Sequence, residues 1–116
     1  VMERLSTDQL RKMRDAQEDV AVINVLDAEH YEKEHIPDSR NIPVDATDFV
    51  SRVEDAVGRK SRQVVVYCAS TECDASSRAA GRLEQAGFSH VLDFAGGMKA
   101  WREANLPVEG RSISGR

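Results

Sequence analysis

The chain has 116 residues, of which 41% are hydrophobic and 31% charged, with a formal net charge of -4. This size and balance predict a single globular domain over residues 1–116, with an ordered core over about residues 3–109. An acidic chain repels nucleic-acid phosphates and anionic lipid headgroups, and its longest apolar runs are far too short to span a bilayer. We therefore expect a cytoplasmic protein that binds neither nucleic acid nor membrane.

Helical and extended patterns alternate along the first sixty residues. Ser6 and Thr7 are helix-capping residues, and a helix that begins there directs Leu10 and Met13 inward. Residues 20–26 (VAVINVL) are rich in β-branched side chains, which predicts a short buried strand. Three elements follow: a short polar helix capped by Asp27, a turn with a brief strand between Pro37 and Pro43, and a helix whose apolar face is Phe49, Val53 and Val57, ended by Gly58.

The second half continues the alternation. Residues 63–68 (QVVVYC) are apolar almost throughout, which predicts a central strand covered on both faces. Next come a helix over residues 76–87 (SSRAAGRLEQAG) ended by Gly87, a strand over 90–94 (HVLDF), a helix over 96–106 (GGMKAWREANL) with Trp101 packed on the sheet, and a tail from Gly110 to Arg116. Alternating strands and helices predict an α/β domain with a parallel sheet.

The two cysteines, Cys68 and Cys73, lie together between the predicted central strand and the helix that follows it. Two cysteines are too few for a disulfide framework, and a pair in one loop indicates redox, metal or nucleophilic chemistry. Cys68 is at the carboxyl end of this strand, and ligands of parallel sheets bind where the carboxyl ends of the strands meet. The histidines lack metal-ligand spacing to this pair, so we expect neither a metal nor another cofactor; they are His30, His35 and His90.

The loop after the strand has the features of an anion site. Backbone N–H groups converge where a loop enters a helix, and the helix dipole adds positive potential there. Such a site stabilises a thiolate, so we expect the pKa of Cys68 to be lowered and its nucleophilicity at neutral pH to be raised. The predicted active-site loop consists of Ala69, Ser70, Thr71, Glu72, Cys73, Asp74, Ala75 and Ser76.

Several motifs together resemble the rhodanese-like domain family over nearly the whole chain. They are the segment over residues 22–43 with its His-Ile-Pro turn, the Tyr-Cys strand end, the Arg-Ala-Ala helix, the Gly-Gly pair before Trp101, and the Leu-Pro-Val that follows. The resemblance implies a five-stranded parallel sheet flanked by helices on both faces, with Leu5 near a short first edge strand. It also implies that Cys68 accepts a sulfane sulfur as a persulfide and passes it to a thiophilic acceptor: cyanide, a thiol or a protein.

The chain departs from the family's pattern around this site. Active members usually end the loop in Arg or Lys, but Ala75 stands there, and the longer loop carries Glu72 and Asp74 with no cation. Asn24 and Leu26 replace the usual Asp-x-Arg pair. Because an acidic loop disfavours a dianion such as thiosulfate, we expect the sulfur donor to be a protein persulfide or a low-molecular-weight polysulfide.

Two other assignments of the nucleophile fit the residues less well. Phosphatases and arsenate reductases of the same fold need Cys-x5-Arg, whereas the sixth residue after Cys68 is Asp74, whose carboxylate repels phosphate. Cys73 and Arg78 have Cys-x4-Arg spacing, but Cys73 does not follow the strand directly, so Cys68 is the preferred nucleophile. Cys73 then either acts as a resolving thiol or fills a gap in the packing.

Three functions are compatible with these residues. The preferred one is a sulfurtransferase that acts through Cys68, with a small sulfur donor or acceptor, or a persulfide-carrying protein, as its partner. The others are a non-catalytic interaction or regulatory module and a thiol redox switch formed by Cys68 and Cys73. His35 is expected to bond backbone within a turn. Arg78 either contacts an anion held by the loop or forms a surface ion pair with Glu72 or Glu84.

Overall fold

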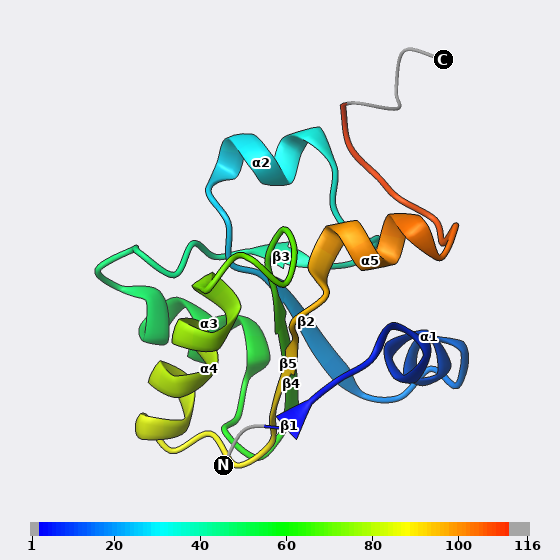
Figure 1. The fold of residues 1–116 in the computed structure, drawn as a ribbon. Coiled ribbons are helices and arrows are strands. Elements are labelled where there is room, and N and C mark those ends of the chain that lie inside the picture. The colour runs from blue at the N-terminus through cyan, green and yellow to red at the C-terminus, as the bar shows by residue number, and fades with distance from the viewer. Residues whose placement is uncertain (1–2, 112–116) are drawn as a thin grey trace.

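The computed structural model describes residues 3–111, which form a parallel β-sheet between two layers of helices (Figure 1). The five strands lie in the order β1-β5-β4-β2-β3, and every neighbouring pair is parallel. Their bounds are β1 (Glu3–Arg4), β2 (Val20–Asn24), β3 (Arg40–Asn41), β4 (Gln63–Tyr67) and β5 (Val91–Phe94). The predicted fold class is confirmed. Strand β4 occupies the centre of the sheet, as its apolar sequence indicates.

Five helices cover the sheet: α1 (Thr7–Asp15), α2 (Ala28–Lys33), α3 (Phe49–Val57), α4 (Ala75–Gln85) and α5 (Gly97–Glu103). Figure 1 shows α3 and α4 on one face of the sheet and α1 and α5 on the other, with α2 beyond the end of β2. None of the helices in residues 3–111 combines the length and the apolar character needed to cross a bilayer.

Local sequence signals account for the ends of these helices. Ser6 caps α1 in a reciprocal capping box, in which its side chain accepts from the backbone N–H of Gln9 and the Gln9 side chain accepts from the N–H of Ser6. Asp27 caps α2 by accepting a backbone N–H bond. Gly58 and Gly87 follow α3 and α4 with φ angles of 94° and 100°, a conformation that glycine adopts at low cost.

The alternating side chains of β4 supply the centre of two hydrophobic clusters, one on each face of the sheet. Val64, Val66 and the following Cys68 belong to the cluster under α3 and α4. Val65 and Tyr67 belong to the cluster under α1 and α5. All five side chains have no exposed surface, so this strand contributes to both layers of the core.

The phenol of Tyr67 joins β4 to the His-Ile-Pro turn. Its oxygen accepts a hydrogen bond from the backbone N–H of Ile36 at 3.0 Å and shares another with the Ser39 hydroxyl at 2.8 Å. Burial raises the pKa of Tyr67, which keeps the hydroxyl protonated. The His35 ring stacks on Tyr31 with 3.9 Å between centroids, and its Nδ1 lies 2.7 Å from the Tyr31 carbonyl oxygen. The structural role expected for His35 is therefore confirmed.

The segment after α5 returns across the molecule to α2. Trp101 is buried, packs edge-to-face on Phe94, and donates from its indole nitrogen to the Pro107 carbonyl at 2.7 Å. Of the predicted tail, Gly110 and Arg111 are described, and Arg111 lies 3.7 Å from a Glu32 carboxylate oxygen on α2. The rest of that tail, residues 112–116, lies outside the described part of the chain.

Candidate active site

Cys68 lies at the carboxyl end of the central strand, immediately before a short loop and helix α4. Helix α4 begins at Ala75, so the predicted loop is too long at its end: Ala75 and Ser76 form the first helical turn. We call residues 69–74 the Cys68 loop. The loop turns sharply because Cys73 donates its backbone N–H to the Ser70 carbonyl at 3.1 Å. This turn places Cys73 next to Cys68.

The Cys68 sulfur is buried and faces a mixture of hydrogen-bond acceptors and donors. Its thiol donates to the Cys73 carbonyl oxygen at 3.5 Å and lies 3.9 Å from the Ser70 carbonyl oxygen. The Ser76 backbone N–H and side chain bond the sulfur from the first turn of α4. Of the backbone N–H groups predicted to surround the sulfur, that of Ser76 lowers the pKa of Cys68, whereas two loop carbonyls lie beside the thiol.

The pKa of Cys68 is raised, so the expected lowering is wrong. Burial is the largest cause, because it penalises the charged thiolate, and a hydrogen bond with the Cys73 side chain acts in the same direction. The Ser76 N–H and hydroxyl oppose this rise, since both stabilise the thiolate, but their effect is smaller. The sequence indicates the helix start correctly. It does not show that the loop carbonyls and the apolar core surround the sulfur.

Carboxylates on the molecular surface hold Arg78, a cation in the first turns of α4. Its guanidinium lies 3.1 Å from Asp45 and 3.3 Å from Asp74, and these neighbours raise the pKa of Arg78. A surface ion pair is one of the two roles predicted for Arg78, although Asp45 and Asp74 are partners that the sequence did not indicate. The arginine is thereby drawn toward two carboxylates on the surface.

Helix α5 fixes the start of the Cys68 loop from the other side. The backbone N–H groups of Met98 and Lys99 donate to the carbonyl oxygens of Cys68 and Ala69 at 3.0 and 2.9 Å. Gly97 adopts a φ of 60°, and a Cβ atom there would lie 2.3 Å from the Cys68 carbonyl oxygen. The Gly-Gly pair predicts turn geometry, but its contact with Cys68 could not be found from the sequence.

Asp93, on β5, is a further residue near the site that sequence reasoning missed. It is fully buried, and its Oδ2 accepts a hydrogen bond from the Ser77 hydroxyl at 3.1 Å. Its other oxygen, Oδ1, has no hydrogen-bond partner among the described residues. Ser77 is in the first turn of α4, so this bond ties the helix start to β5. A single acidic residue in an otherwise apolar strand is the signal that could have identified it.

Amide groups hold the loop after β2, where the chain has Asn24 and Leu26. The Asn24 side-chain oxygen accepts from the backbone N–H of Leu26 at 2.9 Å. The Asn41 amide donates to the Leu26 carbonyl at 2.8 Å and to the Asn24 carbonyl at 3.2 Å. These neutral bonds keep the chain's turn between β2 and α2 close to β3 without a buried charge.

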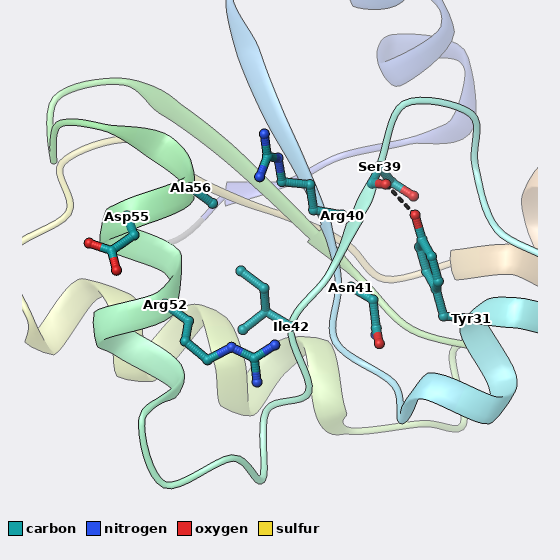
Figure 2. Close-up of a pocket in the computed structure, with 8 residues that line it drawn as sticks. All are labelled: Tyr31, Ser39, Arg40, Asn41, Ile42, Arg52, Asp55 and Ala56. Atoms are coloured by element: carbon teal, nitrogen blue, oxygen red, sulfur yellow. Dashed lines mark hydrogen bonds between the residues drawn. The ribbon is translucent and has the colours of Figure 1, made fainter.

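One hollow of the described residues is separate from the Cys68 loop. It has a volume of about 490 Å³ and lies between α3, β3 and Tyr31 of α2 (Figure 2). Arg40 and Arg52 are on different sides of Ile42 along this groove. A smaller hollow of about 90 Å³ adjoins the Cys68 loop at Ala69. Within residues 3–111, no group of three or more His, Cys, Asp or Glu side chains is placed to hold a metal ion.

A family model described as the rhodanese-like domain matches residues 6–104. The chain belongs to the rhodanese-like domain family. The solution structure of a rhodanese-like domain from Anabaena sp. superposes with a TM-score of 0.84 at 30% sequence identity, covering 98% of this chain and 83% of that one. A thiosulfate sulfurtransferase from Pseudomonas aeruginosa superposes with a TM-score of 0.79 at 20% sequence identity. The superposition covers 94% of this chain and 20% of that one, and it shows the shared fold alone.

Two curated relatives of this rhodanese-like domain have names that describe different functions. A sulfurtransferase from Allochromatium vinosum is 31% identical over 91 residues, covering 78% of this chain and 79% of the relative. An HTH-type transcriptional regulator from Mycobacterium tuberculosis is 33% identical over 101 residues, covering 87% of this chain and 42% of the regulator. The chain therefore spans less than half of that regulator.

Gly97→Ala is expected to destabilise the domain by about 2 kcal/mol or more, because the new methyl group meets the Cys68 carbonyl and the backbone keeps a positive φ. Urea unfolding measures this loss. Gly81→Ala is the matched control, since Gly81 is in α4 and a methyl group there would have no atom within 4 Å. It is expected to stabilise the domain by up to about 1 kcal/mol. Equal stability of the two variants would contradict the contact.

The raised pKa of Cys68 predicts that its alkylation rate increases at a higher pH than that of an unperturbed cysteine thiol. Since Cys73 also reacts, the measurement uses Cys73→Ala and follows iodoacetamide labelling by mass spectrometry. The midpoint of the pH–rate profile is expected above that of the same variant unfolded in urea, because burial keeps the folded thiol protonated at pH values where the unfolded one ionises. A midpoint below that of the unfolded chain would show that the Ser76 donors dominate.

Proposed function

We propose that this rhodanese-like domain is a sulfurtransferase in which Cys68 carries a sulfane sulfur as a persulfide and delivers it to a thiophilic acceptor. The observation that carries the proposal is a thiol at the end of the central strand, bonded by the N–H and hydroxyl of Ser76 at the start of α4. The resemblance to a sulfurtransferase that the chain matches over most of its length supports the same reading.

The reaction consists of two thiol exchanges at one sulfur atom. The Cys68 thiolate attacks the terminal sulfur of a persulfide donor, the donor's S–S bond breaks, and the donor leaves as a thiolate that takes up a proton. The acceptor then attacks the outer sulfur of the Cys68 persulfide, and Cys68 leaves as a thiolate. Ser76 donates hydrogen bonds to that thiolate in both steps, so the same two groups assist Cys68 as nucleophile and as leaving group.

The charge of the Cys68 loop supports a donor other than thiosulfate. Glu72 and Asp74 are exposed, and Arg78 is shared between Asp74 and Asp45. A dianion therefore meets two carboxylates and a cation that is already paired. A protein persulfide or a low-molecular-weight polysulfide fits this field better. A cytoplasmic location, where thiols remain reduced, is part of the same proposal.

A non-catalytic regulatory module is the second candidate. Cys68 has no exposed surface, which is unusual for a group that must meet a substrate. The 33%-identical relative is named as a transcriptional regulator, of which the chain covers less than half. In this alternative, the fold is kept and the loop presents a recognition surface.

Incubation with a low-molecular-weight persulfide donor, followed by intact mass measurement, tests the proposal. Cys73→Ser is expected to gain the mass of one sulfur atom, because Cys68 then has no neighbouring thiol with which to exchange. Cys68→Ser is the matched control and is expected to gain none. Absence of any gain from persulfide, polysulfide and thiosulfate donors would favour the regulatory module.

The double variant Glu72→Gln/Asp74→Asn tests the preference for the donor. Removing two negative charges at the loop is expected to raise thiosulfate-dependent thiocyanate formation from cyanide severalfold, while turnover with a small persulfide changes little. Glu54→Gln/Asp55→Asn, on the exposed side of α3, removes the same charge elsewhere and should leave both rates unchanged. Equal thiosulfate turnover in wild type and the loop variant would argue against electrostatic selection.

A further inference from the structure

The thiols of Cys68 and of Cys73, which lies in the Cys68 loop, differ in their exposure to solvent. Cys68 has no exposed surface, whereas Cys73 retains some and packs against the edge of the same cluster. Both are free thiols rather than a disulfide. The Cys73 carbonyl accepts a hydrogen bond from the Cys68 sulfur at 3.5 Å, and the nearby Cys73 side chain helps to raise the pKa of Cys68.

The loop turn creates this juxtaposition. Ser70 accepts the Cys73 backbone N–H, and its side-chain oxygen accepts the N–H of Glu72 at 3.3 Å, so the chain folds back toward Cys68 within five residues. The α5 amides fix the carbonyls of Cys68 and Ala69, and α4 begins one residue after Asp74. The position of Cys73 is therefore held from both ends of the loop.

We propose that Cys73 is the resolving thiol of this site and that the domain releases the sulfur carried by Cys68 as sulfide. This inference rests on the proposed persulfide at Cys68. Because the Cys68 sulfur lies 3.5 Å from the Cys73 carbonyl oxygen and Cys73 packs against the cluster that contains Cys68, the Cys73 thiol is placed to attack the inner sulfur of the persulfide. An exposed acceptor thiolate must pass Glu72 and Asp74, while Cys73 is already inside the loop.

The step is an intramolecular disulfide exchange. The Cys73 sulfur, as thiolate, attacks Cys68 Sγ, the bond between Cys68 Sγ and the outer sulfur breaks, and the outer sulfur leaves as hydrosulfide. The proton lost by Cys73 is balanced by protonation of the hydrosulfide to hydrogen sulfide. The two cysteines are oxidised to a disulfide, and the sulfane sulfur is reduced to sulfide. A dithiol reductant then restores both thiols for another turnover.

The test is a single turnover without oxygen or reductant. Reduced wild-type protein and the Cys73→Ser and Cys68→Ser variants are each mixed with one equivalent of glutathione persulfide, and sulfide and intact mass are measured. Wild type is expected to release one sulfide per chain and to lose the mass of two hydrogen atoms. Cys73→Ser is expected to retain one added sulfur atom and to release sulfide only at the level of the donor alone.

The outcomes separate this inference from the function on which it rests. A wild-type protein that keeps the added sulfur, with no more sulfide than Cys73→Ser, would overturn the resolving role of Cys73 and leave the sulfurtransferase intact. A Cys73→Ser protein that gains no sulfur would overturn the persulfide on Cys68 itself.

Discussion

The hydrogen bonds from α5 to the carbonyl oxygens of Cys68 and Ala69 are the interaction on which the site depends. A strand buried on both faces must end in a segment whose backbone groups find partners, because unpaired polar groups in a core are costly. The N–H groups of Met98 and Lys99 provide those partners. Gly97 permits the approach, since no side chain separates the two segments. The position of the loop follows from this contact.

The same burial that orders the loop opposes the reactivity of Cys68. Its thiol lies in the apolar cluster under α3 and α4, where a thiolate is poorly solvated, and the loop carbonyls of Ser70 and Cys73 face it. The Ser76 donors offset part of this effect. A buried thiol beside a partly exposed one suits the proposed exchange between neighbouring sulfurs, because the second thiol is already part of the loop.

The departures of this chain from the family's pattern change its electrostatics while preserving its architecture. Asn24 and Leu26 stand in place of the family's usual Asp-x-Arg pair at the end of β2, and the neutral amides of Asn24 and Asn41 hold that turn by hydrogen bonds. Two carboxylates pair with Arg78 near the start of α4. The sheet and helices depend on apolar burial and tolerate both changes, whereas the donor preference that we propose depends on the charge at the loop.

Sequence alone determined the parallel sheet, through the alternation of strands and helices, together with the central position of β4 and the location of Cys68 at a strand end. It also indicated the capping residues Ser6, Asp27, Gly58 and Gly87, because periodicity and capping act within a few neighbouring residues. Tertiary structure decided the surroundings of the Cys68 sulfur, the bond between Asp93 and Ser77, and the contact of Gly97 with the loop. These join residues far apart in the chain, and their net effect on a buried thiol depends on which donors, acceptors and apolar groups meet in space.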